Sequence, residues 1–304
     1  MMRVVVTGIQ GQLARALGEC ASSAIQIVSC GRPELDLLRL QTIEPALRRL
    51  APDIIVSAAA YTQVDLAESE RELAYAVNRG GAGAVAKAAA SLGVPVIHMS
   101  TDYVFGGAKA GPLSEEERTL PQSVYGASKL EGEHAVRSAH ADHVILRTAW
   151  VYSPFGRNFL KTMLRLAEKQ TQVRVVDDQI GCPTSAADLA TGVLEVARNV
   201  LERHKDRTLF GTFHMTGGGQ CASWAEFAQE IMCASHEVGG PAAIVERIGS
   251  ELYPTPARRP SNSCLSNDKL ARVHGITLPD WHRSCRAVVR RLLAADLPIK
   301  ENVQ

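Results

Sequence analysis

The chain has 304 residues, 46% of them hydrophobic and 21% charged, which is ordinary for a globular protein with a large apolar core. Its 33 basic and 32 acidic residues leave a formal net charge of +1, so composition gives no electrostatic reason to expect a nucleic acid or an anionic membrane as partner. No run approaches the roughly 18 apolar residues of a membrane span, and the N-terminal apolar stretch is too short for a signal peptide. We therefore expect a cytoplasmic protein.

In the first half, short apolar runs alternate with longer alanine-rich segments. The runs are apolar almost throughout, as expected for strands covered on both faces, and this order predicts a doubly wound parallel sheet of the Rossmann type. The predicted strands are Arg3–Thr7, Ile25–Cys30, Ile54–Ser57, Val94–Met99 and His143–Arg147. The predicted helices are Gly11–Cys20, Thr42–Leu50, Ala67–Leu92 and Val124–Ala139.

The pattern changes after Trp150, so we divide the chain into a dinucleotide-binding domain (1–150) and a smaller α/β substrate lobe (151–304), partly interleaved with the first. Predicted strands in the second part are Gln172–Val176, Gly211–His214 and Ala243–Arg247. Predicted helices lie near Asn158–Glu168, Ser185–Asn199 and Ser223–Ala234.

Seven cysteines are scattered along the chain with no C-x-x-C pair, at positions 20, 30, 182, 221, 233, 264 and 285. Disulfide frameworks and zinc sites need closer or more regular spacing. We therefore expect reduced cysteines, several of them buried, and no metal site.

A glycine turn follows the first predicted strand. Gly8 and Gly11 would let the backbone turn tightly and approach a pyrophosphate, and the amides of the next helix would face that charge. Ala14, the third small position, permits close helix–strand packing. An ordinary strand-to-helix turn is the alternative, but the position after the first strand of a βαβ series favours a dinucleotide site.

The end of the second predicted strand bears on the choice of coenzyme. Arg32 follows that strand where NAD sites usually carry an acidic residue, and arginine suits the 2′-phosphate of NADPH. A solvated surface arginine, with NADH as coenzyme, is the alternative. Asp36 and Leu37 would flank the adenine, and Ala58–Ala60 would pass along the coenzyme or simply pack in the core.

The catalytic prediction rests on Tyr125 and Lys129, which lie on one face of a helix because they are four residues apart. The Lys129 ammonium would stabilise a tyrosinate and lower the pKa of Tyr125 from about 10, which suits proton transfer. Thr101 ends the fourth strand, where open α/β sheets place their chemistry, and would bond the substrate oxygen. His98 is interpreted as a core histidine.

Longer motifs resemble the extended short-chain dehydrogenase/reductases, and among them the dTDP-4-dehydrorhamnose reductase family. The resemblance covers residues 3 to about 293, and its later motifs are more specific than the glycine turn. They are the stretches 58–65, 67–69, 100–105, 125–129, 147–152, 158–164, 178–184 and 253–263.

The resemblance implies roles for individual residues. Thr101, Tyr125 and Lys129 would be catalytic, and Asp102, Trp150 and Arg259 would contact a sugar nucleotide, with the Arg259 guanidinium on the diphosphate. The implied coenzyme contacts are Gly8, Gly11, Gln12, Leu13, Arg32, Asp36, Leu37, Ala60, Tyr61, Thr62, Met99, Tyr125 and Lys129.

The implied reaction is reduction of the C4 ketone of dTDP-4-dehydro-β-L-rhamnose by NAD(P)H. Another nucleotide-4-keto-6-deoxysugar reductase is one alternative. A non-catalytic relative, similar to the regulatory β-subunit of methionine adenosyltransferase, is the other.

The family also implies a homodimer, sometimes with magnesium bound by glutamates at the dimer contact. Here Ala14, Arg15 and Ala16 follow the glycine turn, so we expect no such magnesium site. Ser153 replaces a usual glycine or alanine, and Met99 a common aromatic residue; both could shift substrate fit.

Overall fold

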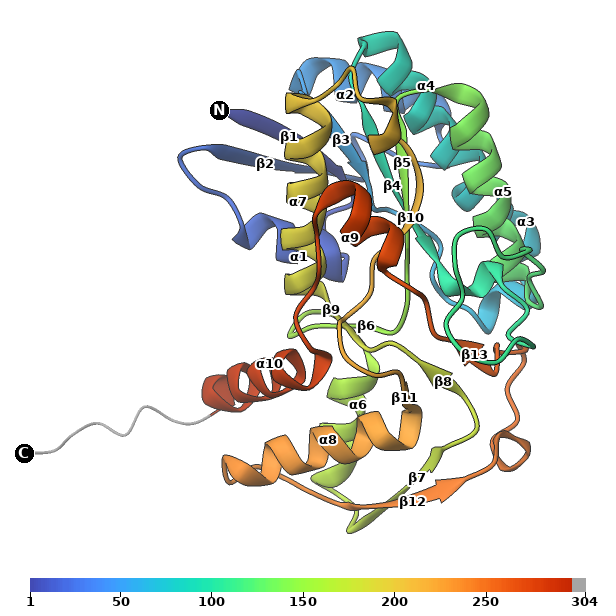
Figure 1. The fold of residues 1–304 in the computed structure, drawn as a ribbon, viewed down its shortest axis with the longest axis vertical. Coiled ribbons are helices and arrows are strands. Elements are labelled where there is room, and N and C mark those ends of the chain that lie inside the picture. Colours follow the sequence, from blue (N-terminus) through green and yellow to red (C-terminus); the bar gives the residue numbers. More distant parts are fainter. Residues whose placement is uncertain (297–304) are drawn as a thin grey trace, which may run out of the picture.

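The computed structural model describes residues 1–296, and its centre is a six-stranded sheet in which every pairing is parallel (Figure 1). The strand order is β10-β5-β4-β3-β1-β2. Its strands are β1 (Met2–Thr7), β2 (Ile25–Cys30), β3 (Ile54–Ser57), β4 (Val96–Thr101), β5 (His143–Thr148) and β10 (Gly211–His214).

Helices cover both faces of this sheet, and a separate apolar core fills each interface. On one face, Leu17 packs with Val193 and Leu270. On the other, Leu47 packs with Val85 and Val136. The first face carries α1 (Gln12–Glu19), α7 (Ala186–Glu202) and α9 (Asp268–His274). The second carries α2 (Ile43–Leu50), α4 (Ala82–Leu92) and α5 (Val124–Ala139). The doubly wound α/β fold is therefore confirmed.

A smaller lobe lies below the sheet in Figure 1 and has its own core around Tyr152, Phe227 and Trp281. Its helices are α6 (Phe159–Ala167), α8 (Trp224–Glu237) and α10 (Trp281–Asp296). Its longer strands, β7 (Gln172–Val176) and β12 (Ile244–Ile248), pair in parallel. Short strands complete it: β6 (Val151–Tyr152) with β9 (Thr184–Ser185), and β11 (Ala222–Ser223) with β8 (Ile180–Gly181) and β13 (Asn262–Ser263).

Several elements differ from the sequence-based expectation. The segment 67–92 is not one regular helix: a 3-10 turn (Leu66–Glu68) precedes α3 (Arg71–Tyr75), and a π-helical stretch (Ala76–Gly81) joins α3 to α4. Two helices were not anticipated, α9 and α10. The expectation that all cysteines are reduced is wrong in this structure, because Cys221 and Cys264 form a disulfide across 43 residues of chain.

The strand order places a topological switch point between β1 and β3, since the chain moves to β2 on one side and to β3 on the other. Ligands of open α/β sheets bind at the carboxyl ends of such strands. Thr7 ends β1, and Thr101 ends β4, two strands away. The fold thus brings the glycine turn and the predicted catalytic strand to one edge.

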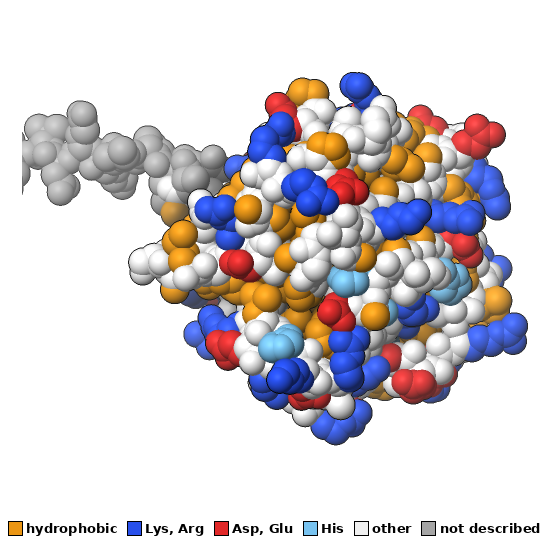
Figure 2. All heavy atoms as spheres, turned by 90° about the horizontal axis from the view of Figure 1, so that it is seen from above, with side chains coloured by type: hydrophobic (Ala, Val, Ile, Leu, Met, Phe, Trp, Pro, Cys, Tyr) orange, Lys and Arg blue, Asp and Glu red, His pale blue; other side chains and the backbone are white. Residues whose placement is uncertain are grey.

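The surface agrees with the balanced charge of the chain. On the face seen in Figure 2, basic and acidic side chains are interspersed with apolar ones. Among residues 1–296, no helix combines the length and the apolar character needed to cross a membrane.

Candidate active site

Close helix packing brings Tyr125 to the end of β4. The hydroxyl of Ser123 accepts a hydrogen bond from the Gly126 amide (3.1 Å) and caps α5. A Cβ at Gly126 would lie only 2.2 Å from the carbonyl oxygen of Tyr103, so only glycine allows α5 to approach this closely. The rings of Tyr103 and Tyr125 meet edge to face at 5.4 Å. The local sequence Tyr-Gly thus places the phenol beside the residues that follow Thr101.

The protonation of Tyr125 differs from the expectation. Burial raises its pKa to about 12; a hydrogen bond with Thr101 acts in the opposite direction, and the Asp102 charge adds to the rise. Lys129 does not lower this pKa here, because its ammonium donates to the carbonyl oxygen of Met99 at 2.7 Å. Tyr125 is therefore a protonated phenol near neutral pH, which is the state a proton donor requires.

Lys129 is also buried, and its surroundings shift its pKa. Burial lowers its pKa to about 8, while the charge of Glu133 acts to raise it. Its ammonium also lies 3.4 Å from Nε2 of His98, whose Nδ1 lies 3.2 Å from the Ser57 hydroxyl. His98 is fully enclosed, as expected of a core histidine, and burial holds its pKa well below the usual value. A neutral imidazole can accept a hydrogen bond from Lys129.

A buried ion pair holds α5 against the sheet. The Glu133 side chain is 0% exposed. One of its carboxylate oxygens accepts a hydrogen bond from Nε of Arg147 (2.8 Å), and the other accepts one from Nη2 of the same guanidinium (2.7 Å). The Ser100 hydroxyl donates to the same carboxylate at 2.6 Å. Glu133 lies four residues after Lys129, so Tyr125, Lys129 and Glu133 form one stripe on α5. Sequence reasoning missed Glu133, although this repeated spacing could have revealed it.

Asn78 is a second residue that sequence reasoning missed. It is buried in the π-helical stretch, where its side chain bonds both backbone groups of Tyr61 (2.9 and 3.1 Å) and the Ser128 hydroxyl (2.9 Å). π-Helical turns often mark functional sites. Asn78 therefore ties the predicted coenzyme segment Ala60–Thr62 to the catalytic helix. A hydrophobic periodicity gives no signal for such a contact.

The glycine turn has the geometry of a dinucleotide cradle. Gly8 has φ +92°, and a Cβ there would lie 3.3 Å from that of Ala59. The Thr7 hydroxyl accepts hydrogen bonds from the amides of Ala58 and Ala59, both 3.1 Å, and so fixes the distance between the β1 and β3 turns. Gly11 caps α1 in an extended conformation with open space around it. These residues fit a pyrophosphate at the helix N-terminus.

The residues expected near the adenosine follow β2. Arg32 is exposed at the end of β2. Asp36 closes a local turn by accepting a bond from the Leu38 amide (3.0 Å). Leu37 is buried, and a Cβ at Gly81 would lie 2.6 Å from its own Cβ. Arg32 is thus accessible to a charged ligand, whereas Leu37 is buried against Gly81.

Gln12 joins the coenzyme side to the second lobe. Its amide nitrogen donates to the carbonyl of Val151 (3.2 Å), and its oxygen accepts from the Ser153 hydroxyl (2.7 Å) and the Asn158 amide (2.9 Å). The unusual Ser153 therefore has a structural partner. The neighbouring Leu13 is buried in the core of its face. Through these bonds, the helix that follows the glycine turn is fixed relative to the lobe.

Trp150 forms the wall between the two parts. Its φ of +47° is rare for a side-chain-bearing residue, and its ring stacks on Trp224 at 3.6 Å and 9°. A Cβ at Gly181 would lie 2.4 Å from the Trp150 ring. The motif Asp178–Thr184 thus needs glycine at its centre to accommodate this indole.

Arg259 and Asp102, the two charged residues expected to contact the substrate, both make hydrogen bonds within the protein. Arg259 makes a bidentate pair with Asp65 (3.0 and 2.8 Å), so its guanidinium already binds a carboxylate in this structure. Asp102 is buried, and burial raises its pKa to about 6 although hydrogen bonds from Ser263 and Thr101 act to lower it. Its second oxygen has no partner among the described residues. A polar ligand group could satisfy that oxygen.

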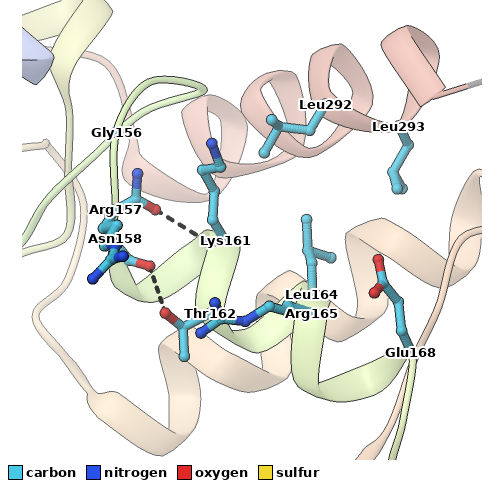
Figure 3. Close-up of a pocket in the computed structure, with 10 residues that line it drawn as sticks. All are labelled: Gly156, Arg157, Asn158, Lys161, Thr162, Leu164, Arg165, Glu168, Leu292 and Leu293. Atoms are coloured by element: carbon cyan, nitrogen blue, oxygen red, sulfur yellow. Dashed lines mark hydrogen bonds between the residues drawn. The ribbon is translucent and has the colours of Figure 1, made fainter. Parts of the chain in front are cut away.

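A groove in the second lobe is lined by a different set of residues. It has a volume of about 590 Å³ and lies between α6 and α10 (Figure 3). Lys161 and Arg165 line it together with Leu292 and Leu293. None of the predicted catalytic residues lines it, so this groove is not the candidate active site.

Comparisons with known proteins point to one family. A model of the family described as RmlD substrate binding domain matches residues 2–294. A dTDP-4-dehydrorhamnose reductase of Sinorhizobium fredii is 54% identical over 292 residues, covering 96% of this chain and 98% of that protein. The reductase of the same name from Escherichia coli K12 is 38% identical, covering 96% and 98%. A Bacillus anthracis dTDP-4-dehydrorhamnose reductase solved with NADP has a TM-score of 0.87 at 34% identity, covering 96% and 100%.

The buried ion pair gives a test of how the catalytic helix is held. Glu133→Gln should lower the free energy of unfolding by about 3–5 kcal/mol at pH 7, because it leaves the Arg147 charge buried without its counter-ion. Urea denaturation measures this. The matched control is Glu131→Gln on the exposed side of α5, which should change stability by less than about 0.5 kcal/mol. Equal effects of the two variants would contradict a special role for the pair.

The same pair has a predictable pH dependence. Burial alone would raise the pKa of Glu133, but Arg147, Ser100 and Arg137 outweigh it and hold the pKa below its usual 4.5. A group with a lowered folded pKa stabilises fully above its unfolded pKa and loses that contribution as pH falls through the folded one. The difference between wild type and Glu133→Gln should therefore be constant above pH 4.5 and shrink below it.

Proposed function

This chain belongs to the dTDP-4-dehydrorhamnose reductase family, and from that membership we propose how its site works. The chain is an NAD(P)H-dependent oxidoreductase that reduces the C4 ketone of dTDP-4-dehydro-β-L-rhamnose to give dTDP-L-rhamnose. The observation that carries the assignment of the site is the position of Tyr125 and Lys129 on one face of α5, against Thr101 at the carboxyl end of β4.

The residues of the chain divide the chemistry among them. When bound, the reduced nicotinamide supplies the hydride. Tyr125 donates its phenolic proton to the ketone oxygen, and its raised pKa keeps that proton in place until charge develops on the substrate. The Thr101 hydroxyl, which now donates its single proton to Asp102, turns to donate a second hydrogen bond to the same oxygen. Lys129, whose ammonium donates to the Met99 carbonyl, lies on the same face of α5 as Tyr125 and binds the nicotinamide ribose.

The coenzyme is held at the β1–β3 switch point. Gly8, Gly11 and the first amides of α1 bind its pyrophosphate, and Ala60–Thr62 line its path toward Lys129. Arg32 binds the 2′-phosphate, so NADPH is the preferred coenzyme.

The sugar nucleotide lies against the second lobe. Trp150 and Asp102 contact the sugar, and Arg259 binds the diphosphate through the fork that Asp65 now occupies. Residues 1–150 hold the coenzyme, and residues from 151 onward mainly hold the substrate.

We place the enzyme in the cytoplasm and propose that it is a homodimer. Light scattering measures the mass of the particle in solution, and a monomeric mass would contradict the dimer.

The proton donor is tested by Tyr125→Phe. Turnover should fall by at least ~100-fold, within the range for loss of a general acid, while the Kd for NADPH stays within about twofold because the ring remains. Steady-state kinetics and coenzyme fluorescence measure the two quantities. Tyr75→Phe, in α3, is the control and should leave turnover unchanged. Near wild-type turnover in Tyr125→Phe would remove this residue from the mechanism.

The coenzyme preference is tested by Arg32→Ala. Loss of a charge-assisted hydrogen bond of ~1.5–3 kcal/mol should weaken NADPH by roughly one to two decades and leave NADH nearly unchanged. Titration calorimetry with both coenzymes gives the ratio. The exposed Arg39 offers a matched control of equal charge. Parallel losses for both coenzymes, or none, would show that Arg32 does not read the 2′-phosphate.

The substrate assignment is tested by binding of dTDP and UDP to wild type and to Arg259→Ala. The variant should bind dTDP about tenfold or more weakly and bind NADPH as before. Arg258→Ala is the neighbouring control. If the wild type does not bind dTDP at millimolar concentration, the assignment of a sugar-nucleotide site is contradicted. If it binds UDP more tightly than dTDP, the substrate carries uridine and not thymidine.

A further inference from the structure

Three cysteines far apart in the sequence meet at one end of the small three-stranded sheet. Cys182 directly follows β8, Cys221 directly precedes β11, and Cys264 directly follows β13. Gly181 pairs with Ala222 in the antiparallel direction and with Ser263 in the parallel one. The next pair in each register is therefore Cys182 with Cys221 and Cys182 with Cys264. The backbone alone places the three residues in one row.

The side chains converge as well. The three sulfur atoms lie within 4.8 Å of one another, and Sγ of Cys182 is 3.4 Å from that of Cys221. Cys182 and Cys264 are buried, with 5% and 6% of their surface exposed, whereas Cys221 is half-buried. The row therefore has one side open to solvent, through which an ion could enter.

This arrangement suits a soft cation. A zinc–thiolate bond of about 2.3 Å implies sulfur–sulfur separations of about 3.8 Å in a tetrahedron, close to the 3.4 Å between Cys182 and Cys221. Cys221 and Cys264 reach such a separation once their disulfide is reduced. Thiolates select Zn²⁺ and similar thiophilic ions over Mg²⁺ or Ca²⁺. Three protein sulfurs leave a fourth position for water. The proposed catalytic residues contribute none of these ligands.

We propose that Cys182, Cys221 and Cys264 form a binding site for one thiophilic divalent cation, with Zn²⁺ as the natural occupant, in the reduced protein. The disulfide between Cys221 and Cys264 is then the oxidised form of the empty site. A dithiol reduces it by two electrons: the S–S bond breaks, both cysteines gain a proton, and the dithiol becomes a cyclic disulfide. The cation then displaces the three thiol protons to solvent.

The site lies where it can stiffen the substrate lobe. Cys182 is part of the motif 178–184, next to the glycine beneath Trp150, and Cys264 closes the segment 253–263 that carries Arg259. The Cys264 carbonyl accepts a bond from the Leu113 amide at 2.7 Å. One ion would hold together strands that are each only two residues long.

The test uses the full-length protein, reduced with a dithiol that is then removed under anaerobic conditions. We expect one equivalent of Co²⁺ to give thiolate charge-transfer absorption and tetrahedral visible bands, and Zn²⁺ to displace it. Elemental analysis should find one zinc per chain after desalting. Zinc should raise the thermal midpoint of the wild type, because it binds the folded protein more tightly than the unfolded chain.

Variants separate this site from other metal binding. Cys182→Ser and Cys264→Ser should each abolish the charge-transfer band or weaken binding at least about tenfold, because each removes one of three ligands. Cys233→Ser, at an exposed cysteine of α8, should bind as wild type. Absence of the band in reduced wild type, or equal binding by Cys182→Ser, would overturn the proposal. Reformation of the disulfide in the presence of zinc would overturn it too.

Discussion

The carboxylate of Glu133, held inside the protein by Arg147, is the constraint on which the catalytic arrangement depends. An unpaired charge at that depth would be costly, so the helix can settle only where both oxygens of Glu133 meet the guanidinium. Two turns earlier, the same stripe carries Tyr125. The rotation of α5 about its axis is thus set by an ion pair that takes no part in the reaction.

Two glycines of α5 add a second constraint, because they allow the helix to pack closely against the neighbouring backbone. At Gly132 a Cβ would lie 2.2 Å from the Asn78 carbonyl, and Gly126 meets the Tyr103 backbone equally closely. The ion pair fixes how α5 is turned, and the two glycines fix how near it lies. The Ser153 hydroxyl donates to Gln12, so the coenzyme side and the substrate side are linked by a direct hydrogen bond.

Most of the sheet could be predicted from sequence because each strand is a continuous apolar run and Gly8 marks the first turn. The elements that could not be predicted lack such a signal. The helix α10 begins at Trp281 within a polar context. The π-helical stretch Ala76–Gly81 continues directly from α3 into α4, so the sequence predicts one helix there. The pairing of Asp65 with Arg259 spans 194 residues, so no local pattern announces it. The three clustered cysteines were missed for the same reason: they flank strands of two residues, too short for any periodicity.

The stacked indoles of Trp150 and Trp224 have an optical consequence. Two nearly parallel rings 3.6 Å apart share their electronic excitation, so the pair should contribute a distinctive near-ultraviolet dichroism unlike that of an isolated tryptophan. The chain has only three tryptophans, and two of them form this pair beside the proposed sugar position. The protein therefore carries an intrinsic chromophore at the boundary of its two parts. Near-ultraviolet circular dichroism can follow the ordering of that boundary without an added label.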